Sequence, residues 1–368
     1  MKILLTQHYE QREPRTAIAL LDLAVYGRKH GHTIDVAYAD EDHDWAAYDA
    51  IGYSAIDLCQ QVRDDLESLV RRSQRTITLG GKAVNAILPE DKAWLDSLGV
   101  QGWTGGGERW LHDEKVDYST YPEWSELDFG KLNRADSIVE MMTSRGCPYH
   151  CHFCNNTEPK VVQFSPERTA KNAALIVNTF GRSRVFFVDD IFAVNSQRML
   201  DILDACDRIG VDLRCKVQFF VHVKHLVPKV LDAIQIIHPM EVQIGIESGD
   251  SRMLKAMGKT FTPAEAEDAL QNLYERNVRV AALFLMGFPG ETPESLEHTV
   301  NFMDRNRKYM SGWCVGYYQP IPYTRGWQLA AARLGRIVTG YRNDDITYLD
   351  PNLTERQLRE ARQAAMVY

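Results

Sequence analysis

Short apolar or alternating runs that end in turn residues recur along the first 112 positions of the chain. These strand-like runs lie at 2–6, 33–39, 49–55, 75–81 and 98–103. Amphipathic helical patterns separate them, most clearly at 15–31, where a glycine ends the pattern, and at 60–73. Strands that alternate with helices indicate βα units built around a parallel sheet. We therefore expect residues 1–112 to form a Rossmann-like, doubly wound α/β domain.

The polar, aromatic stretch 113–136 shows no clear periodicity, so we interpret 113–137 as a linker that packs on the surface. The alternation restarts at Ile138. Six further strand-like runs follow, at 137–144, 183–190, 213–221, 240–248, 278–287 and 311–320. Helical patterns separate them, near 165–180, 196–209, 226–235, 263–277 and 292–309. This repetition predicts a partial (β/α)6 barrel over 138–330, with its chemistry at the carboxyl ends of the strands, and a partly helical cap or tail at 331–368.

Composition narrows the possible partners. The 368 residues are 45% apolar and 25% charged, with a formal net charge of −8, which disfavours a broad nucleic-acid or anionic-membrane surface. The sequence contains neither a signal-peptide pattern nor an apolar run of about 18 residues, so no membrane segment is expected. Seven cysteines, an odd number, fit reduced thiols in the cytoplasm better than disulfides.

Three cysteines cluster directly after the first strand of the predicted barrel. Cys147, Cys151 and Cys154 have the spacing C-x3-C-x2-C. Soft thiolates at this spacing suit an iron–sulfur cluster, in which one iron would have no protein ligand. A zinc site completed by His150 or His152 is the alternative, because sites with three cysteines and one histidine are common.

The segment "SRGCPYHCHFC" resembles the signature of the radical S-adenosylmethionine (SAM) superfamily. Three further blocks resemble that family in the same order, at 185–195, 242–262 and 283–300. The resemblance spans 138–330 and implies a [4Fe–4S] cluster that cleaves SAM reductively to a 5′-deoxyadenosyl radical. It leaves a zinc-stabilised binding module as a remote alternative.

The resemblance also implies contacts to SAM. The matching positions are Asp189, Asp190, Glu247, Gly287, Pro289, Gly290 and Glu291. The two aspartates match groups near the methionyl ammonium, although a capped turn at a strand end would explain them too. Glu247 matches a contact to the ribose hydroxyls or the amino-acid end, and 287–291 matches the block near the adenine. Where relatives carry an arginine and an acid, this chain has His222 and Lys224; either could pair with the methionyl carboxylate, and His222 could equally be a core histidine.

The N-terminal domain resembles the cobalamin-binding-type domain that often precedes such barrels. The tentative cobalamin contacts are Ser54, Gly80, Gly81, Gly106 and Glu108, all near strand carboxyl ends. The motif that supplies a lower axial histidine is absent, and a domain that is only a scaffold is the alternative. A methylthiotransferase would need three more cysteines in this domain, where only Cys59 is present. We expect Cys59, Cys206, Cys215 and Cys314 to be buried apolar residues, with a small chance that Cys314 faces the substrate.

Taken together, the resemblances imply a cobalamin-dependent radical SAM methyltransferase that acts on an unactivated carbon of a small molecule. A radical SAM rearrangement, oxidation or cyclisation, with or without cobalamin, is the alternative. The expected electron donor is a flavodoxin or ferredoxin, and no nucleic-acid partner is expected. Trp313, Tyr317, Tyr318 and Arg325 could recognise a flat or anionic substrate, although an aromatic core strand explains the first three equally well.

Overall fold

The computed structural model describes residues 1–9, 17–41, 43–132, 139–156, 158–179, 181, 184–333, 335–337 and 345–366. The predicted boundary between linker and barrel at 137/138 lies outside these residues, as does part of the predicted tail. The chain forms two compact units: Met1–Met142 with Gln163–Val185, and Thr143–Val162 with Phe186–Tyr368.

The first unit contains a parallel sheet with the strand order β2-β1-β3-β4-β5. Its strands are β1 (Lys2–Gln7), β2 (Thr33–Tyr38), β3 (Ala50–Ser54), β4 (Ile77–Gly80) and β5 (Val100–Gly102). Its helices include α1 (Ile18–Lys29), α2 (Gln60–Ser73), α3 (Pro89–Leu98) and α4 (Gly107–Leu111). All five predicted strands and both predicted helices form. Apolar positions of the strands and of α2 fill one core, with Leu66 and Leu79 fully buried, and Leu20 and Leu21 of α1 are buried as well.

The stretch predicted to be a surface linker is more deeply buried than expected. It contains the helix α5 (Glu126–Leu132), and its aromatic side chains Tyr121, Trp124 and Phe129 are almost inaccessible to solvent. Lone aromatic residues spaced by prolines and acids give no helical period, so the sequence pattern concealed this packing.

A buried ion pair holds these aromatic residues in the first unit. Asp22 of α1 accepts hydrogen bonds from Trp124 Nε1 (2.7 Å) and from the guanidinium of Arg168 in α6 (Pro166–Ala174). Both charged side chains are 1% exposed. The Arg168 guanidinium also lies over the Phe164 ring, 4.0 Å from its centroid, and its Nε donates to the Pro122 carbonyl. Helix α6 therefore packs with the first unit, although the sequence places it among the barrel repeats.

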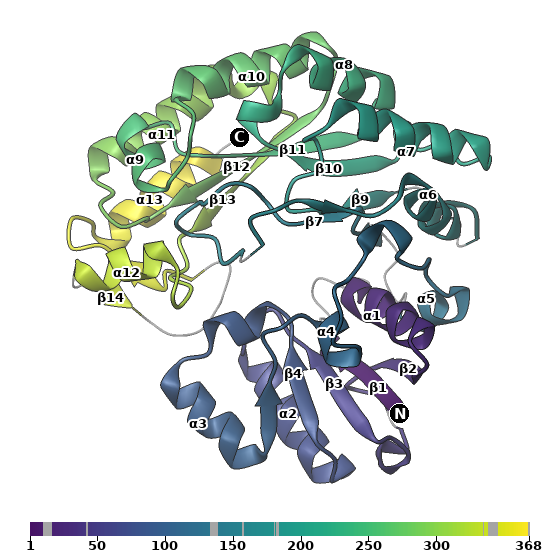
Figure 1. The fold of residues 1–368 in the computed structure, drawn as a ribbon. Coiled ribbons are helices and arrows are strands. Elements are labelled where there is room, and N and C mark those ends of the chain that lie inside the picture. Colours follow the sequence, from purple (N-terminus) through teal and green to yellow (C-terminus); the bar gives the residue numbers. More distant parts are fainter. Residues whose placement is uncertain are drawn as a thin grey trace. The chain divides into compact units, whose positions relative to one another are not determined.

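The larger sheet has the sequential order β13-β12-β11-β10-β9-β6. Its strands are β6 (Val139–Met141), β9 (Val185–Phe187), β10 (Val217–Val221), β11 (Glu241–Glu247), β12 (Val280–Met286) and β13 (Gly312–Tyr317). The intervening helices are α7 (Ser196–Arg208), α8 (Pro228–Ile237), the short α9 (Ser251–Ala256), α10 (Pro263–Glu275) and α11 (Pro293–Asn306), and Figure 1 shows α7, α8, α10 and α11 along one face of strands β10–β12. A one-way order of parallel strands, each followed by a helix, is that of an open barrel, so the predicted fold class is confirmed.

The described part of 331–368 is a cap that packs on the barrel rather than a free tail. Helix α13 (Glu355–Met366) follows the strand pair β14 (Arg336–Ile337) and β15 (Tyr348–Leu349), and it packs against α11 and β13. Trp313 Nε1 donates to the Ala365 carbonyl (2.8 Å), and Arg362 Nε donates to the Val315 carbonyl (2.9 Å). Tyr317 and Tyr318 are buried beneath this cap, which supports the core explanation for both rings.

Within the described residues, no helix is both long enough and apolar enough to cross a bilayer.

Asp22→Asn should destabilise the protein by about 3–5 kcal/mol, because it leaves the buried Arg168 guanidinium without a counter-charge. Lys171→Gln on the same helix is the matched control. Its ion pair with Glu123 is exposed at the surface, so the loss should be about 1 kcal/mol or less. Urea unfolding followed by circular dichroism measures both values. An equal decrease in the free energy of unfolding of the two variants would show that the buried ion pair contributes no more to stability than the exposed one.

Candidate functional site

The three clustered cysteines lie on the loop between the short strands β7 (Ser144–Arg145) and β8 (Val162–Gln163). Cys147 and Cys151 are half-buried and Cys154 is exposed. Gly146 begins the loop with φ +90°, and a Cβ atom there would lie 2.2 Å from the Lys160 carbonyl oxygen. Only glycine fits this turn, so the loop closes back on itself directly before its first thiol.

Asp189 holds the base of the cysteine loop. Its carboxylate is fully buried and accepts hydrogen bonds from Thr143 N (2.6 Å), Thr143 Oγ1 (2.5 Å) and Ser144 Oγ (2.7 Å). Burial raises the pKa of Asp189, and these donors oppose that rise. The neighbouring Asp190 is exposed and accepts from Gly146 N (3.1 Å). The structure thus gives Asp189 a bracing position beneath the loop, and only Asp190 of the pair lies at the surface.

The far side of the loop is held by backbone contacts around His152. His152 N donates to the Met257 carbonyl (2.8 Å), and the Gly326 N–H donates to the His152 carbonyl (2.6 Å). The ring Nδ1 of His152 hydrogen-bonds the Ala256 carbonyl (2.7 Å). A Cβ atom at Gly258 would lie 2.9 Å from the His150 carbonyl oxygen, so a side chain there would push the loop away. The position of the three thiols is therefore set by elements from both ends of the barrel sequence.

A buried ion pair lies next to the thiols, and the sequence predicted only one of its two residues, Glu247, as part of the site. Lys259 Nζ lies 3.0 Å from Glu247 Oε1, and these side chains are 5% and 13% exposed. Burial alone would lower the pKa of Lys259, but the negative charges of Glu247 and Cys151 raise it. Glu247 has φ +68°, and the register of β11 shifts beside it, which turns its carboxylate at the strand end. The lysine two residues after Met257 was visible in the sequence, but nothing local marked it as buried.

His222 and Lys224 separate in the structure. The His222 ring stacks on Tyr149 of the cysteine loop, with centroids 3.7 Å apart. Burial, reinforced by the charge of Lys259, lowers the pKa of His222 to about 3, so the ring is neutral. Its buried Nε2 atom has no hydrogen-bond partner among the described residues. Lys224 is exposed and forms an ion pair with Glu265, so the structure brings His222 but not Lys224 to the loop.

The "GFPGE" block forms a tight turn after β12. Gly287 and Gly290 both have positive φ, and Gly287 N donates to Glu291 Oε2. Glu291 is fully buried, and burial raises its pKa to about 8. Gly290 N donates to Asp350 Oδ2 (2.8 Å), while Arg333 holds the same carboxylate through two nitrogens. Pro289 lies on the wall of a nearby hollow. The turn is therefore fixed by the C-terminal cap.

In the first unit, three of the proposed cobalamin contacts meet at one sheet edge. Ser54 and Gly80 are register partners at the carboxyl ends of β3 and β4, and Gly81 follows with φ +85°. A Cβ atom at Gly80 or Gly106 would contact nothing closer than 3.8 Å, so no protein atom crowds these two positions. Glu108 is different, because it is 3% exposed and accepts from Tyr121 OH (3.1 Å).

One polar cluster near this edge was not predicted from the sequence. Asp65 Oδ2 lies 2.7 Å from Tyr53 OH and 3.0 Å from His8 Nδ1, directly after β1. No motif links these three residues, which are far apart in the sequence, so only the fold brings them together.

Two of the four remaining cysteines are not buried as expected. Cys206 is buried and Cys59 is half-buried, but Cys215 and Cys314 are exposed. Cys215 lies in a turn with φ +59°, and Cys314 lies on β13, the edge strand of the sheet. The apolar character of a cysteine therefore does not by itself predict burial, which depends on where its element lies in the fold.

The chemistry of the loop fits an iron–sulfur cluster. Cys147, Cys151 and Cys154 influence one another electrostatically, and burial raises the pKa of Cys151 to about 11, with Lys259 opposing that rise. Three soft thiolates can each take one iron of a cuboidal cluster. Among the residues with described positions, no three His, Cys, Asp or Glu side chains gather closely enough around one point to hold a single metal ion.

Comparison with known proteins agrees with this geometry. Residues 141–303 match the sequence profile of the Radical SAM superfamily. An uncharacterised methyltransferase of Pyrococcus horikoshii, PH0819, is 29% identical over 247 residues, which cover 65% of this chain and 51% of that protein. The hopanoid C-2 methylase of Rhodopseudomonas palustris is 24% identical over 347 residues, covering 87% and 64%. The chain thus spans about half to two thirds of the length of these curated relatives.

The fold also resembles a solved structure over its whole length. The radical SAM methyltransferase TsrM of Kitasatospora setae, with tryptophan and a SAM analogue bound, aligns with a TM-score of 0.77 and 15% identity, covering 100% of this chain and 89% of TsrM. A second structure of TsrM, with cobalamin and a [4Fe–4S] cluster bound, aligns with a TM-score of 0.69 and 15% identity, covering 99% and 85%. At this identity the likeness shows the fold alone.

The raised pKa of Glu291 predicts a pH-dependent stability. A carboxyl whose folded pKa, about 8, exceeds its ordinary value of 4.5 stabilises the fold most below pH 4.5 and loses that contribution as the pH rises toward 8. Glu291→Gln mimics the protonated carboxyl and should remove this slope, on the order of a few kcal/mol.

Urea unfolding of the wild type and of Glu291→Gln at pH 5.5 and pH 8.5 measures the difference. Glu294→Gln, an exposed acid three residues later, is the control and should keep the wild-type slope. A Glu291→Gln variant with the same slope as the wild type would show that Glu291 titrates normally.

Proposed function

We propose that the protein is a cobalamin-dependent radical SAM methyltransferase acting on an unactivated carbon of a small molecule, and the match of residues 141–303 to the Radical SAM superfamily supports this proposal. The observation that carries the proposal is the loop of Cys147, Cys151 and Cys154, fixed from both sides at the end of the first strand of an open barrel. An enzyme that generates a radical needs its cluster ligands at a defined distance from the strand ends, where the substrate binds.

The three thiolates would hold a [4Fe–4S] cluster, and SAM would bind beside it. When bound, the reduced cluster supplies the electron that cleaves SAM into methionine and a 5′-deoxyadenosyl radical. Asp190, Glu247 and the neutral His222 are the groups of this chain that can accept or donate hydrogen bonds to SAM near the loop. Of His222 and Lys224, Lys224 is the less suitable partner for the methionyl carboxylate of SAM, because its ammonium already forms an ion pair with Glu265.

The protein's own role in this reaction is orientation and exclusion of water. The 287–291 turn, fixed by Asp350, offers a backbone surface on which an adenine could lie, as the resemblance implies. The buried Lys259–Glu247 ion pair lies beside the thiols and would provide a fixed dipole next to a bound cluster.

Cobalamin binding to the first unit is the further part of the proposal. The support is the glycine-lined edge formed by Ser54, Gly80 and Gly81, together with the cobalamin seen in TsrM, a protein of the same fold. Bound methylcobalamin would supply the methyl group. Gly106 lies on the neighbouring turn, whereas the buried Glu108 would orient that turn rather than touch the ligand. The proposed reductant is a flavodoxin or ferredoxin.

Anaerobic reconstitution should give about four irons per chain and production of 5′-deoxyadenosine from SAM. Replacing any of the three loop cysteines by alanine should abolish both, because each thiolate holds one iron. Cys215→Ala, which removes an exposed thiol outside the loop, is the control and should retain both. Iron analysis and chromatography of the products measure the outcome. One zinc and no iron in the wild type would contradict the proposal.

Hydroxocobalamin added during reconstitution should remain bound after desalting, with about one cobalt per chain. Gly80→Leu should weaken this binding at least tenfold, because its side chain would fill the open edge. Gly312→Leu, at the start of β13 in the second unit, is the control and should bind cobalamin like the wild type, because nothing lies within 4 Å of a Cβ atom there. Absorbance spectra and cobalt counts give the result. If the protein binds iron and cleaves SAM but retains no cobalt, the first unit would be only a scaffold, and a cobalamin-free radical reaction would be favoured.

A further inference from the structure

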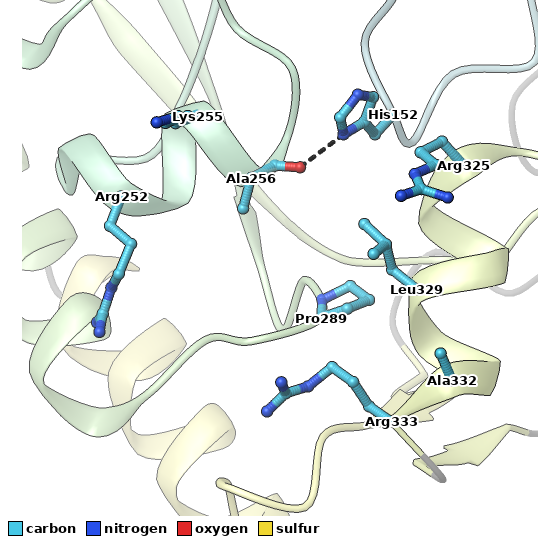
Figure 2. A pocket seen from close by; sticks show the side chains of 9 residues that line it. All are labelled: His152, Arg252, Lys255, Ala256, Pro289, Arg325, Leu329, Ala332 and Arg333. Carbon is cyan, nitrogen blue, oxygen red and sulfur yellow. Dashed lines mark hydrogen bonds between the residues drawn. The ribbon is translucent and has the colours of Figure 1, made fainter.

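A hollow of about 490 Å³ lies beside the cysteine loop, within the second unit. Figure 2 shows that its wall comes from helices α9 and α12 (Arg325–Ala332) and from two loops, those carrying His152 and Pro289. His152 stands between two of the loop cysteines in the sequence, and its ring is fixed by the Ala256 carbonyl. A molecule in this hollow would therefore touch the cysteine loop directly.

The charged groups of this hollow are all basic. Arg252, Lys255, Arg325 and Arg333 line it, in a chain whose formal net charge is −8. Asp350 neutralises Arg333 through two hydrogen bonds. The other three are not neutralised in the same way. Arg252 is exposed and its Nε lies 4.0 Å from the buried Asp250 carboxylate, which is the upper limit for an ion pair. The Arg325 guanidinium is hydrogen-bonded to the uncharged side chain of Gln328.

The remaining wall is apolar. Ala256, Pro289, Leu329 and Ala332 contribute it, and Leu329 follows Arg325 by one turn of the same helix. A hollow with cations on its rim and apolar groups on its wall suits a small molecule that carries both an anionic group and a hydrocarbon part. The positive charges of Arg252, Lys255 and Arg325 exceed the single negative charge of one ligand carboxylate. Arginine guanidinium groups also match the geometry of phosphate oxygens.

We propose that this hollow binds the phosphate or diphosphate group of a phosphorylated small molecule, with the apolar part of that molecule against Leu329 and Ala332. The identification of this molecule as the substrate rests on the proposed radical SAM function, because the hollow adjoins the loop that would hold the cluster. The binding itself rests only on the hollow and its charges.

The test uses pyrophosphate as the probe and anaerobically reconstituted full-length protein. Isothermal titration calorimetry should give saturable binding that weakens as potassium chloride is added. Lys255→Gln and Arg325→Gln should each weaken the affinity about tenfold, and the double variant more than either. Both residues are exposed, so folding should be preserved. Lys229→Gln and Arg356→Gln, exposed cations on α8 and α13, are the controls and should bind like the wild type.

A citrate arm separates phosphate from carboxylate recognition. Citrate should bind at least tenfold more weakly than pyrophosphate, and equal binding would overturn the assignment to phosphate. The absence of pyrophosphate binding at millimolar concentration, or equal binding by all variants, would overturn the proposal. So would variants that bind pyrophosphate normally but are reduced more slowly by an acidic electron carrier, since that result assigns the cations to a protein-docking surface.

Iron content and 5′-deoxyadenosine formation, measured on the same preparations, keep the two proposals apart. Normal values without pyrophosphate binding would contradict only the anion site. Loss of iron in the wild type would contradict the radical function, whatever the calorimetry shows.

Discussion

The position of one irregular loop is the constraint on which the site depends. Three thiols on a segment without helix or strand can act together only if the backbone between them is fixed from outside. Asp189 supplies part of that restraint from below, and the His152 hydrogen bonds supply the rest from the α9 and α12 side. A fully buried carboxylate is costly to desolvate, and it is tolerated here because three donors satisfy it. In this structure the Asp189 carboxylate holds the base of the cysteine loop in place.

The charged and titratable groups near the cysteine loop are arranged around its three thiols. Negative charge on the clustered cysteines is unfavourable, because burial raises the pKa of Cys147 and Cys151. The ammonium of Lys259, which is paired with Glu247, opposes that rise. His222, close to the same ammonium, stays neutral because a second buried cation would be unfavourable. The buried charges beside the thiols thus include an ion pair, whereas the charged groups that line the hollow beside His152 are all basic.

The repeating elements of this chain could be predicted because their apolar periods are long and regular. The strands β11 and β12 alternate buried and half-buried positions throughout, as a strand covered on one face by helices must. Three features could not be predicted in this way: the burial of Trp124, the pairing of Lys259 with Glu247, and the exposure of Cys314. Each depends on contacts between residues distant in sequence, which no local period records. The three cysteines were recognisable because their spacing is itself local. The roles of the SAM and cobalamin contacts remain predictions, since they concern molecules that must still be shown to bind.

The pairing of Asp22 with Arg168 has a consequence for how such a chain can be recombined with others. In a chimaera joined between the two sequence-defined domains, Asp22 would come from one parent protein and the residue at position 168 from the other. The buried pair would form only if the second parent also has an arginine there. Exchange of the N-terminal domain alone therefore leaves a mismatched charge in the interior of any chimaera whose new neighbour lacks the arginine. The exchangeable piece is discontinuous: it comprises the N-terminal fold together with the first barrel helix, and shuffling that respects this boundary preserves the interior.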